Sequence, residues 1–283
     1  MSYSLASTPL WLLTLLFYLL LLAAQGVGMY LRRRRRTRLH DGAIPGPGKD
    51  AAGEDAFAMN SVLGLLALLI GFTFSLALNR YDSRRELVVK EANALGTTWL
   101  RTDLLPPQER ARMQDVLRRY VDARVSFGLA RTSEEELVRY HQTELLQNEL
   151  WSVMTSAIAG FHDTPRASLV VSTTNDSIDL AAERLATRQA HIPPRILRML
   201  LLFALLAAAL VGYERANQPK ATALLLLLFA LAVGLVIDLD RPSTGMTNVP
   251  QTPMLDLQRS LRQAPPAAAG QGALRLPLSA PAS

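Results

Sequence analysis

The stretch GFTFSLALNRYDSRRELVVKEANALGTTWL, residues 71–100, changes from apolar to highly charged without a break. No glycine or proline lies between Phe72 and Ala94, and the apolar residues beyond the change keep a helical spacing. A glutamate and a lysine four residues apart support the same helix. We therefore predict one helix, over about residues 56–101, that begins in a membrane and continues about 30 Å into water.

The composition of the whole chain places it among membrane proteins. Of its 283 residues, 49% are hydrophobic and 19% are charged. A helix needs about 20 apolar residues to cross the hydrocarbon core, and a segment one turn shorter is tolerated in a thin bilayer. The sequence thus predicts an all-α integral membrane protein with four transmembrane helices, at residues 9–31, 56–79, 195–213 and 220–238.

The segments between these helices differ in character. Residues 32–55 are basic and rich in glycine and proline, which is typical of a linker. Residues 80–194 show apolar spacing of helical period and no strand pattern, so we expect a helical extramembrane bundle between spans two and three. Residues 239–283 form a C-terminal tail, expected to be disordered from about residue 264.

An arginine run directly follows the first span, at Arg32–Arg36 and Arg38. Such residues resist translocation, so this loop is expected in the cytoplasm, with the N-terminus and the bundle outside. The residues before the first span carry no lysine or arginine, which favours a retained anchor over a signal peptide. The arginines also suit anionic headgroups, so membrane lipids rather than nucleic acid are the expected partners.

Small and polar residues recur along one face of the second span. Two interpretations are open: a narrow pore lining, or close packing of helices in lipid. Packing is favoured for a single chain, and an oligomer around an axis satisfies both. The candidate residues are Asn60, Gly64, Ala67, Gly71 and Ser75.

Charged residues follow at the end of the same span. Arg80 and Arg84, one turn apart, are pore-mouth candidates that would attract anions, although interfacial anchoring explains them more simply. Glu91 and Asn93 are expected to contact arginines of the next helix, at Arg119 or Arg124.

Nothing in the sequence predicts an active site or a cofactor. Asn175 and Asp179 have i,i+4 spacing, which favours a polar contact over a metal site. The chain has no cysteine, its four histidines are scattered, and no phosphate-binding or nucleophile motif occurs. The span interiors also carry no charged residue, which argues against active transport. We therefore expect neither an enzyme nor a resident metal.

Several blocks of the chain together resemble a known family, the bacterial bestrophin-like membrane proteins. The resemblance covers about residues 63–261. It rests on Arg80, Tyr81, Arg84, Glu91, Asn93, Asn175, Asp179 and the run DLDRPSTG at residues 238–245, which includes Asp240, Pro242 and Gly245.

This resemblance implies kinship with bestrophins, which are pentameric anion channels with four spans and a helical cytosolic domain. It implies a multi-pass homo-oligomer of the bacterial inner membrane that conducts chloride or other anions. It also places the bundle in the cytosol, opposite to the orientation that the arginine run predicts. The alternative function is a non-conducting scaffold or sensor whose bundle binds a partner.

Overall fold

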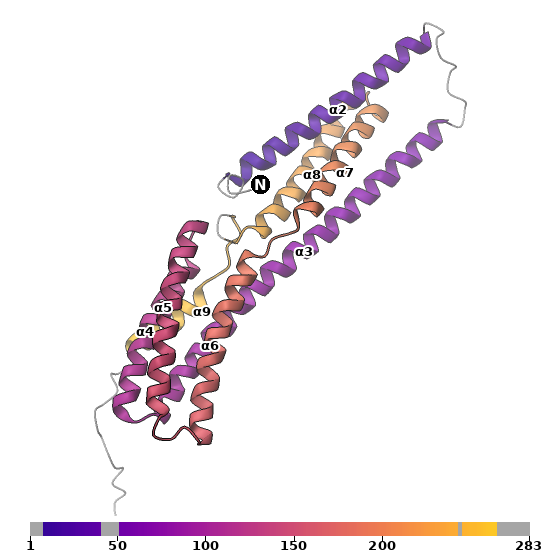
Figure 1. Cartoon of the computed structure of the whole chain (residues 1–283). Helices are drawn as coiled ribbons and strands as arrows, with labels where there is room; N and C mark the ends of the chain where they lie inside the picture. The colour runs from indigo at the N-terminus through magenta and orange to yellow at the C-terminus, as the bar shows by residue number, and fades with distance from the viewer. Residues whose placement is uncertain (1–7, 41–50, 243–244, 265–283) are drawn as a thin grey trace, which may run out of the picture. The chain divides into compact units, whose positions relative to one another are not determined.

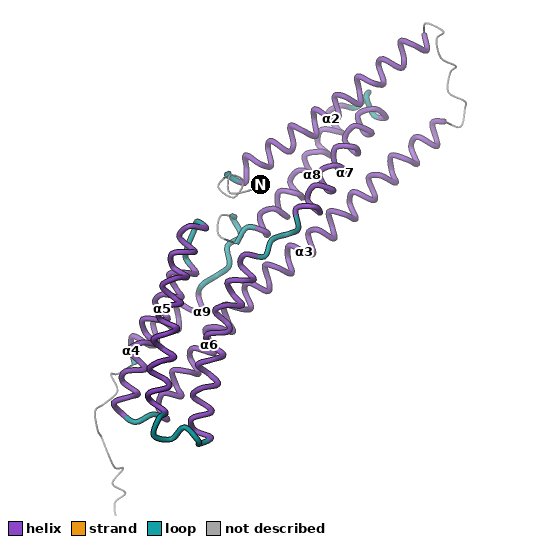
Figure 2. Tube along the Cα trace, in the orientation of Figure 1, coloured by secondary structure: helices purple, strands orange, loops and turns teal. Residues whose placement is uncertain are grey.

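The computed structural model describes residues 8–40, 51–242 and 245–264, and in these residues it contains helices and loops but no strand (Figure 2). The chain divides into two compact units. The first comprises residues 1–85 and 186–249, and the second comprises residues 86–185 and 250–283. Each unit is described by itself.

The first unit contains α2 (Leu10–His40), α7 (Pro194–Glu214), α8 (Pro219–Asp240) and the N-terminal part of α3 (Ala51–Arg101). Helices α2, α7 and α8 pack against one another (Figure 1). The side chain of Gln25 in α2 donates to Thr222 near the start of α8, and Arg241 after α8 donates to the carbonyl of Thr8 at 2.8 Å. The two contacts run in opposite order along the two helices, so α2 and α8 are antiparallel.

All four helices of this unit are long and apolar enough to cross a membrane. Their shared core includes Leu21 of α2, Leu66 of α3, Leu200 of α7 and Leu226 of α8, each at most 1% exposed. Many other leucines on these helices remain exposed, which suits a surface covered by lipid tails.

Helix α3 is continuous from Ala51 to Arg101 and belongs to both units. At 1.5 Å per residue its length is about 76 Å, more than twice the hydrocarbon thickness. The sequence predicted this single helix because no residue between the apolar and charged parts breaks it. A 3₁₀ turn, η1 (Thr102–Leu104), then ends it before two prolines.

Helix α2 is longer than we expected, because it continues through residues 32–40, which we assigned to the linker. Arginine is a good helix former, and no glycine or proline lies between Arg32 and Gly42. The glycine- and proline-rich part of the predicted linker, residues 41–50, lies outside the described residues.

The second unit contains the C-terminal part of α3, then α4 (Pro107–Gly128), α5 (Ser133–Ile158), α6 (Pro165–Gln189) and α9 (Thr252–Gln263). Proline at the first position suits α4, because the missing N–H group would have no partner there. Thr132 caps α5 by accepting the N–H of Glu135 at 3.1 Å. The buried interior includes Leu95, Met113, Leu117, Tyr120, Leu150 and Met154.

Helix α9 was not predicted, because we assigned residues 239–263 only to the ordered part of a C-terminal tail. Its apolar residues Met254 and Leu261 are buried, and it packs on α4. Arg118 of α4 donates to the carbonyl of Leu261 at 3.2 Å, and Asp122 accepts from Gln258 at 2.6 Å. This helix was missed because it is short and has a proline in its first turn. Residues 265–283, where we predicted disorder, lie outside the described part.

Candidate functional site

The predicted stripe on α3 is uncovered in the isolated chain. A Cβ atom added to Gly64 or Gly71 would meet nothing within 4 Å. The stripe therefore does not pack against another described helix of its own chain. All five of its members are exposed: Asn60, Gly64, Ala67, Gly71 and Ser75.

The opposite face of α3 carries the packing within the unit. Leu66 is 1% exposed and Ala77 is buried completely, while Thr73 donates to the carbonyl of Leu69 of its own helix at 2.7 Å. One face of this helix is therefore committed to the fold. The other is available to lipid or to another copy of the chain.

The guanidinium of Arg84 binds four backbone carbonyls and is only 4% exposed. It donates to Ala190 at 2.7 Å, Leu239 at 3.2 Å, Thr187 at 3.3 Å and Asp240 at 3.3 Å. These carbonyls belong to the C-terminal ends of α6 and α8, where orphan acceptors and the helix dipole favour a cation. We assign Arg84 this structural role in place of the predicted pore mouth.

Helical spacing places both predicted pore-mouth arginines, Arg80 and Arg84, on a different face of α3 from the stripe. Arg80 and Arg84 continue the buried series of Thr73 and Ala77 at steps of three and four residues. The stripe continues instead from Ser75 through Leu78 to Asp82 and Arg85, all of which are exposed. Steps of three and four residues from Ser75 would have identified Asp82, from the sequence, as the first charged residue that continues the stripe.

Asp238, the first aspartate of the run DLDRPSTG, lies near the end of α8 and binds residues that follow this helix. Asp238 is 2% exposed and accepts the N–H groups of Met246 at 2.6 Å and Thr247 at 3.1 Å. The hydroxyl of Thr247 donates to the same carboxylate at 2.7 Å. A Cβ at Gly245 would lie 2.6 Å from an Asp238 carboxylate oxygen and 2.8 Å from the Asp238 carbonyl oxygen, so a larger residue would force the backbone to shift.

The second aspartate of this run, Asp240, holds the chain before α7. Its carboxylate accepts the N–H of Ile192 at 2.9 Å, and its carbonyl oxygen lies 3.1 Å from Nδ1 of His191. Pro242 follows directly and lacks the N–H that would continue α8. These family-signature residues fix the connection between helices of the first unit.

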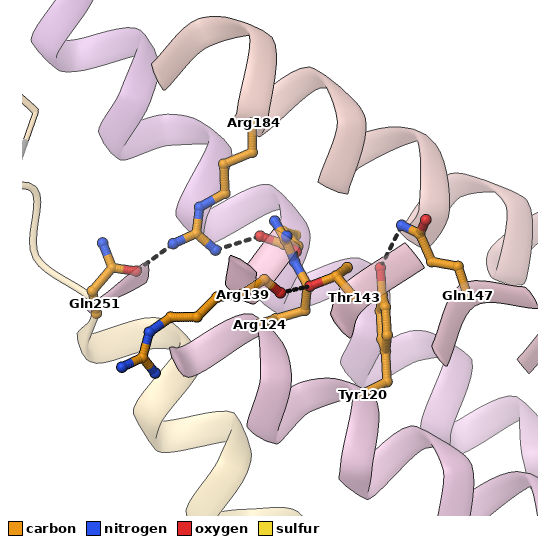
Figure 3. Close-up of polar contacts among 8 residues, drawn as sticks. Tyr120, Arg124, Arg139, Thr143, Gln147, Arg184 and Gln251 are labelled. Atoms are coloured by element: carbon orange, nitrogen blue, oxygen red, sulfur yellow. Dashed lines mark hydrogen bonds and ion pairs between the residues drawn. The ribbon is translucent and has the colours of Figure 1, made fainter. Parts of the chain in front are cut away.

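A buried ion-pair cluster lies inside the second unit (Figure 3). The Glu91 carboxylate, fully buried on α3, accepts from Arg124 of α4 and from Arg184 of α6. Arg184 also donates to Gln251, just before α9. One carboxylate thus ties together three helices and the start of a fourth.

The charges of this cluster hold one another in the ionised form. Burial alone would raise the pKa of Glu91, but Arg124 and Arg184 outweigh it and lower that pKa below its usual range. The Arg124 guanidinium also lies 4.5 Å from the centre of the Phe127 ring, whose face attracts a cation.

Arg124 is one of the two partners that the sequence proposed for Glu91, while Arg184 and Gln251 were not foreseen. The other proposed arginine, Arg119, instead pairs with Glu149, with Nη1 and Oε2 2.9 Å apart. Asn93 is exposed on α3.

The remaining polar pair is a surface contact. Asn175 donates to Asp179 at 2.8 Å on the exposed face of α6. Among the residues described, no three histidine, cysteine, aspartate or glutamate side chains gather closely enough to hold a metal ion.

Comparison with known proteins agrees with this architecture. A sequence model of the bestrophin-like domain matches residues 19–254. No match was found among curated proteins. A crystal structure of a bacterial bestrophin homologue from Klebsiella pneumoniae is 17% identical, covers 87% of this chain and 96% of its own, and gives a TM-score of 0.61.

Two mutants of that homologue match equally well, each with a TM-score of 0.61. One is 15% identical and covers 87% of this chain and 96% of its own. The other is 17% identical and covers 88% and 97%. At such identities the structural likeness establishes the fold, while the domain match spans most of the sequence. The chain is therefore an integral membrane protein of the bestrophin-like family.

Proposed function

We propose that this protein forms a homo-oligomeric ion channel of the bacterial inner membrane, in which copies of α3 surround a central pore. The observation that carries the proposal is the exposure of the α3 stripe at membrane depth. Gly64 and Gly71 have open space beside them, and Asn60 and Ser75 place polar groups in the same row.

The stripe differs from the other exposed surfaces of the membrane helices. On α8 the exposed positions include Leu228, Leu231 and Leu235, which suit lipid tails. Amide, hydroxyl and glycine positions gain nothing from lipid, whereas small residues let helices of neighbouring copies approach an axis closely. A narrow, mildly polar lining of this kind can conduct small ions.

Anion permeation rests on kinship with bestrophins, and chloride is the first ion to test. The predicted pore-mouth arginines do not support anion permeation, because Arg84 binds backbone carbonyls inside its own subunit. The exposed charges that continue the stripe are Asp82 and Arg85, which have opposite signs. The ratio of chloride to sodium permeability must therefore be measured from reversal potentials.

The test compares two glycine-to-leucine variants in planar bilayers. Gly71→Leu fills the stripe without a clash in its own subunit, so the oligomer should assemble and its current should fall at least tenfold, or about 1.4 kcal/mol in the conduction barrier. Gly26→Leu on α2, which also has open space beside it, should conduct like the unmodified protein.

Oligomer mass in detergent should be measured first, because a monomer has no axis for a pore. A folded oligomer that carries no current would contradict the channel and favour the alternative of a scaffold or sensor. Equal currents from the Gly71→Leu and Gly26→Leu variants would contradict the proposal that the stripe lines the pore. They would not contradict the proposal that the protein is a channel.

A further inference from the structure

The arginine run at the end of α2 divides into two groups with different surroundings. Arg32 donates to the carbonyls of Tyr213, at 2.9 Å, and Glu214, and Arg35 donates to the Tyr213 hydroxyl at 2.6 Å. The Arg32 contacts satisfy two C-terminal carbonyls of α7, as cations at a helix end commonly do. Two of the arginines therefore hold α2 and α7 together.

The other four arginines of the run have exposed side chains. None of these side chains has a hydrogen-bond or ion-pair partner within the described residues. Because α2 remains helical to His40, these side chains stand on a rigid extension of the first span. They are Arg33, Arg34, Arg36 and Arg38.

Aromatic residues place this extension at the height of the lipid headgroups. Trp11 and Tyr30 of α2 are 67% and 61% exposed, and such residues commonly mark the two membrane interfaces. They are separated by about 28 Å along the helix, close to the thickness of the hydrocarbon core. The arginines that follow Tyr30 therefore lie among phosphates.

The same end of the unit carries two further exposed cations, Arg215 after α7 and Lys220 in the first turn of α8. Glu214 is the only acid in residues 8–40 and 194–237. This excess of positive charge complements a phosphate surface, and arginine binds phosphate oxygens through paired N–H groups.

We propose that Arg33, Arg34, Arg36 and Arg38 form a binding surface for the headgroups of anionic phospholipids. Arg32 and Arg35 serve the fold instead. Each cation close to an anionic leaflet strengthens binding about fivefold, so the four together select anionic over zwitterionic lipid. This proposal does not depend on whether the protein conducts ions.

The test uses the full chain purified in an uncharged detergent, with phosphatidylglycerol as the probe. Native mass spectrometry counts bound lipid, and a thermal melt follows the stabilisation that bound lipid confers. The R33Q/R34Q/R36Q/R38Q variant should bind phosphatidylglycerol at least tenfold more weakly, about 1.4 kcal/mol. A matched control removes four exposed arginines of the second unit, R112Q/R131Q/R166Q/R259Q, and should bind like the unmodified chain.

Three results would overturn the proposal. Phosphatidylcholine could stabilise the protein as much as phosphatidylglycerol does. Soluble glycerol phosphate could give the same stabilisation, which would assign the surface to free phosphate. The variant could also keep full affinity. If the fourfold variant does not fold, R33Q/R34Q and R36Q/R38Q should each lose part of the affinity.

Discussion

Gly212 of α7 lies directly against the backbone of Gln25 in α2, because a Cβ at Gly212 would come within 2.1 Å of the Gln25 carbonyl oxygen. Gly28, one turn further along α2, approaches Ala209 in the same way, at 1.9 Å. Lipid offers no hydrophobic drive for helix association, so this close contact contributes to holding the two spans together.

Replacing Gly212 with alanine should therefore destabilise the membrane unit. The added methyl group forces the backbones of α2 and α7 apart, which costs about 1–3 kcal/mol in a packed interior. The melting temperature in detergent should fall. Gly26→Ala, with open space beside it, should melt at the same temperature or higher, because alanine favours a helix. Equal melting of both variants would contradict the close contact.

Glu91→Gln should destabilise the second unit by about 3–5 kcal/mol, because it leaves two buried arginines without their counter-charge. Denaturation followed by helical circular dichroism would measure the loss. The control is Glu86→Gln, which breaks an exposed pair with Lys90 and should cost no more than about 1 kcal/mol. Similar losses from both variants would disprove the central role of Glu91.

The lowered pKa of Glu91 predicts a particular pH dependence. Its ordinary value is 4.5, and a carboxylate with a lower pKa in the folded protein contributes its full stability above that pH. That contribution should be lost as the pH falls through the folded-state pKa, below 4.5. Measured across this range, the stability difference between the unmodified chain and Glu91→Gln should shrink with decreasing pH. A constant difference down to pH 2.5 would contradict the linkage.

Arg84→Gln should lower thermal stability by about 2–4 kcal/mol, because several buried carbonyls would lose a charged donor. The neighbouring Arg85 is exposed, so Arg85→Gln should stay within about 0.5 kcal/mol of the unmodified chain. If Arg84→Gln leaves stability unchanged and alters only the current, the pore-mouth interpretation regains support.

The orientation in the membrane can be read from cysteine labelling, since the chain contains no natural thiol. We expect the end of α2 that carries the arginines to face the cytoplasm. An impermeant maleimide added to intact cells should then label Gln142→Cys in α5, while Thr37→Cys should react only after permeabilisation; both positions are exposed. The reverse pattern would place the bundle in the cytosol, as kinship with bestrophins implies.

The sequence by itself determined the four apolar helices and the continuity of α3 across the change from apolar to charged residues. Hydrophobic length, helical period and the absence of breakers are local properties, and each acts within a few turns of one helix. The same information pointed to Arg124 as a partner of Glu91, because both lie on consecutive helices of one bundle.

Only the tertiary structure decided which residue each charged side chain meets. Arg84 follows an apolar span, and that position suits a pore mouth or, more simply, an interfacial anchor. In the folded protein the C-terminal ends of α6 and α8 lie against Arg84, and its side chain caps both helices. Likewise, Glu91 gained Arg184 from a distant part of the chain, and α9 formed where α4 could bury its short apolar face. Contacts between distant segments depend on how helices pack, and no local pattern encodes that arrangement.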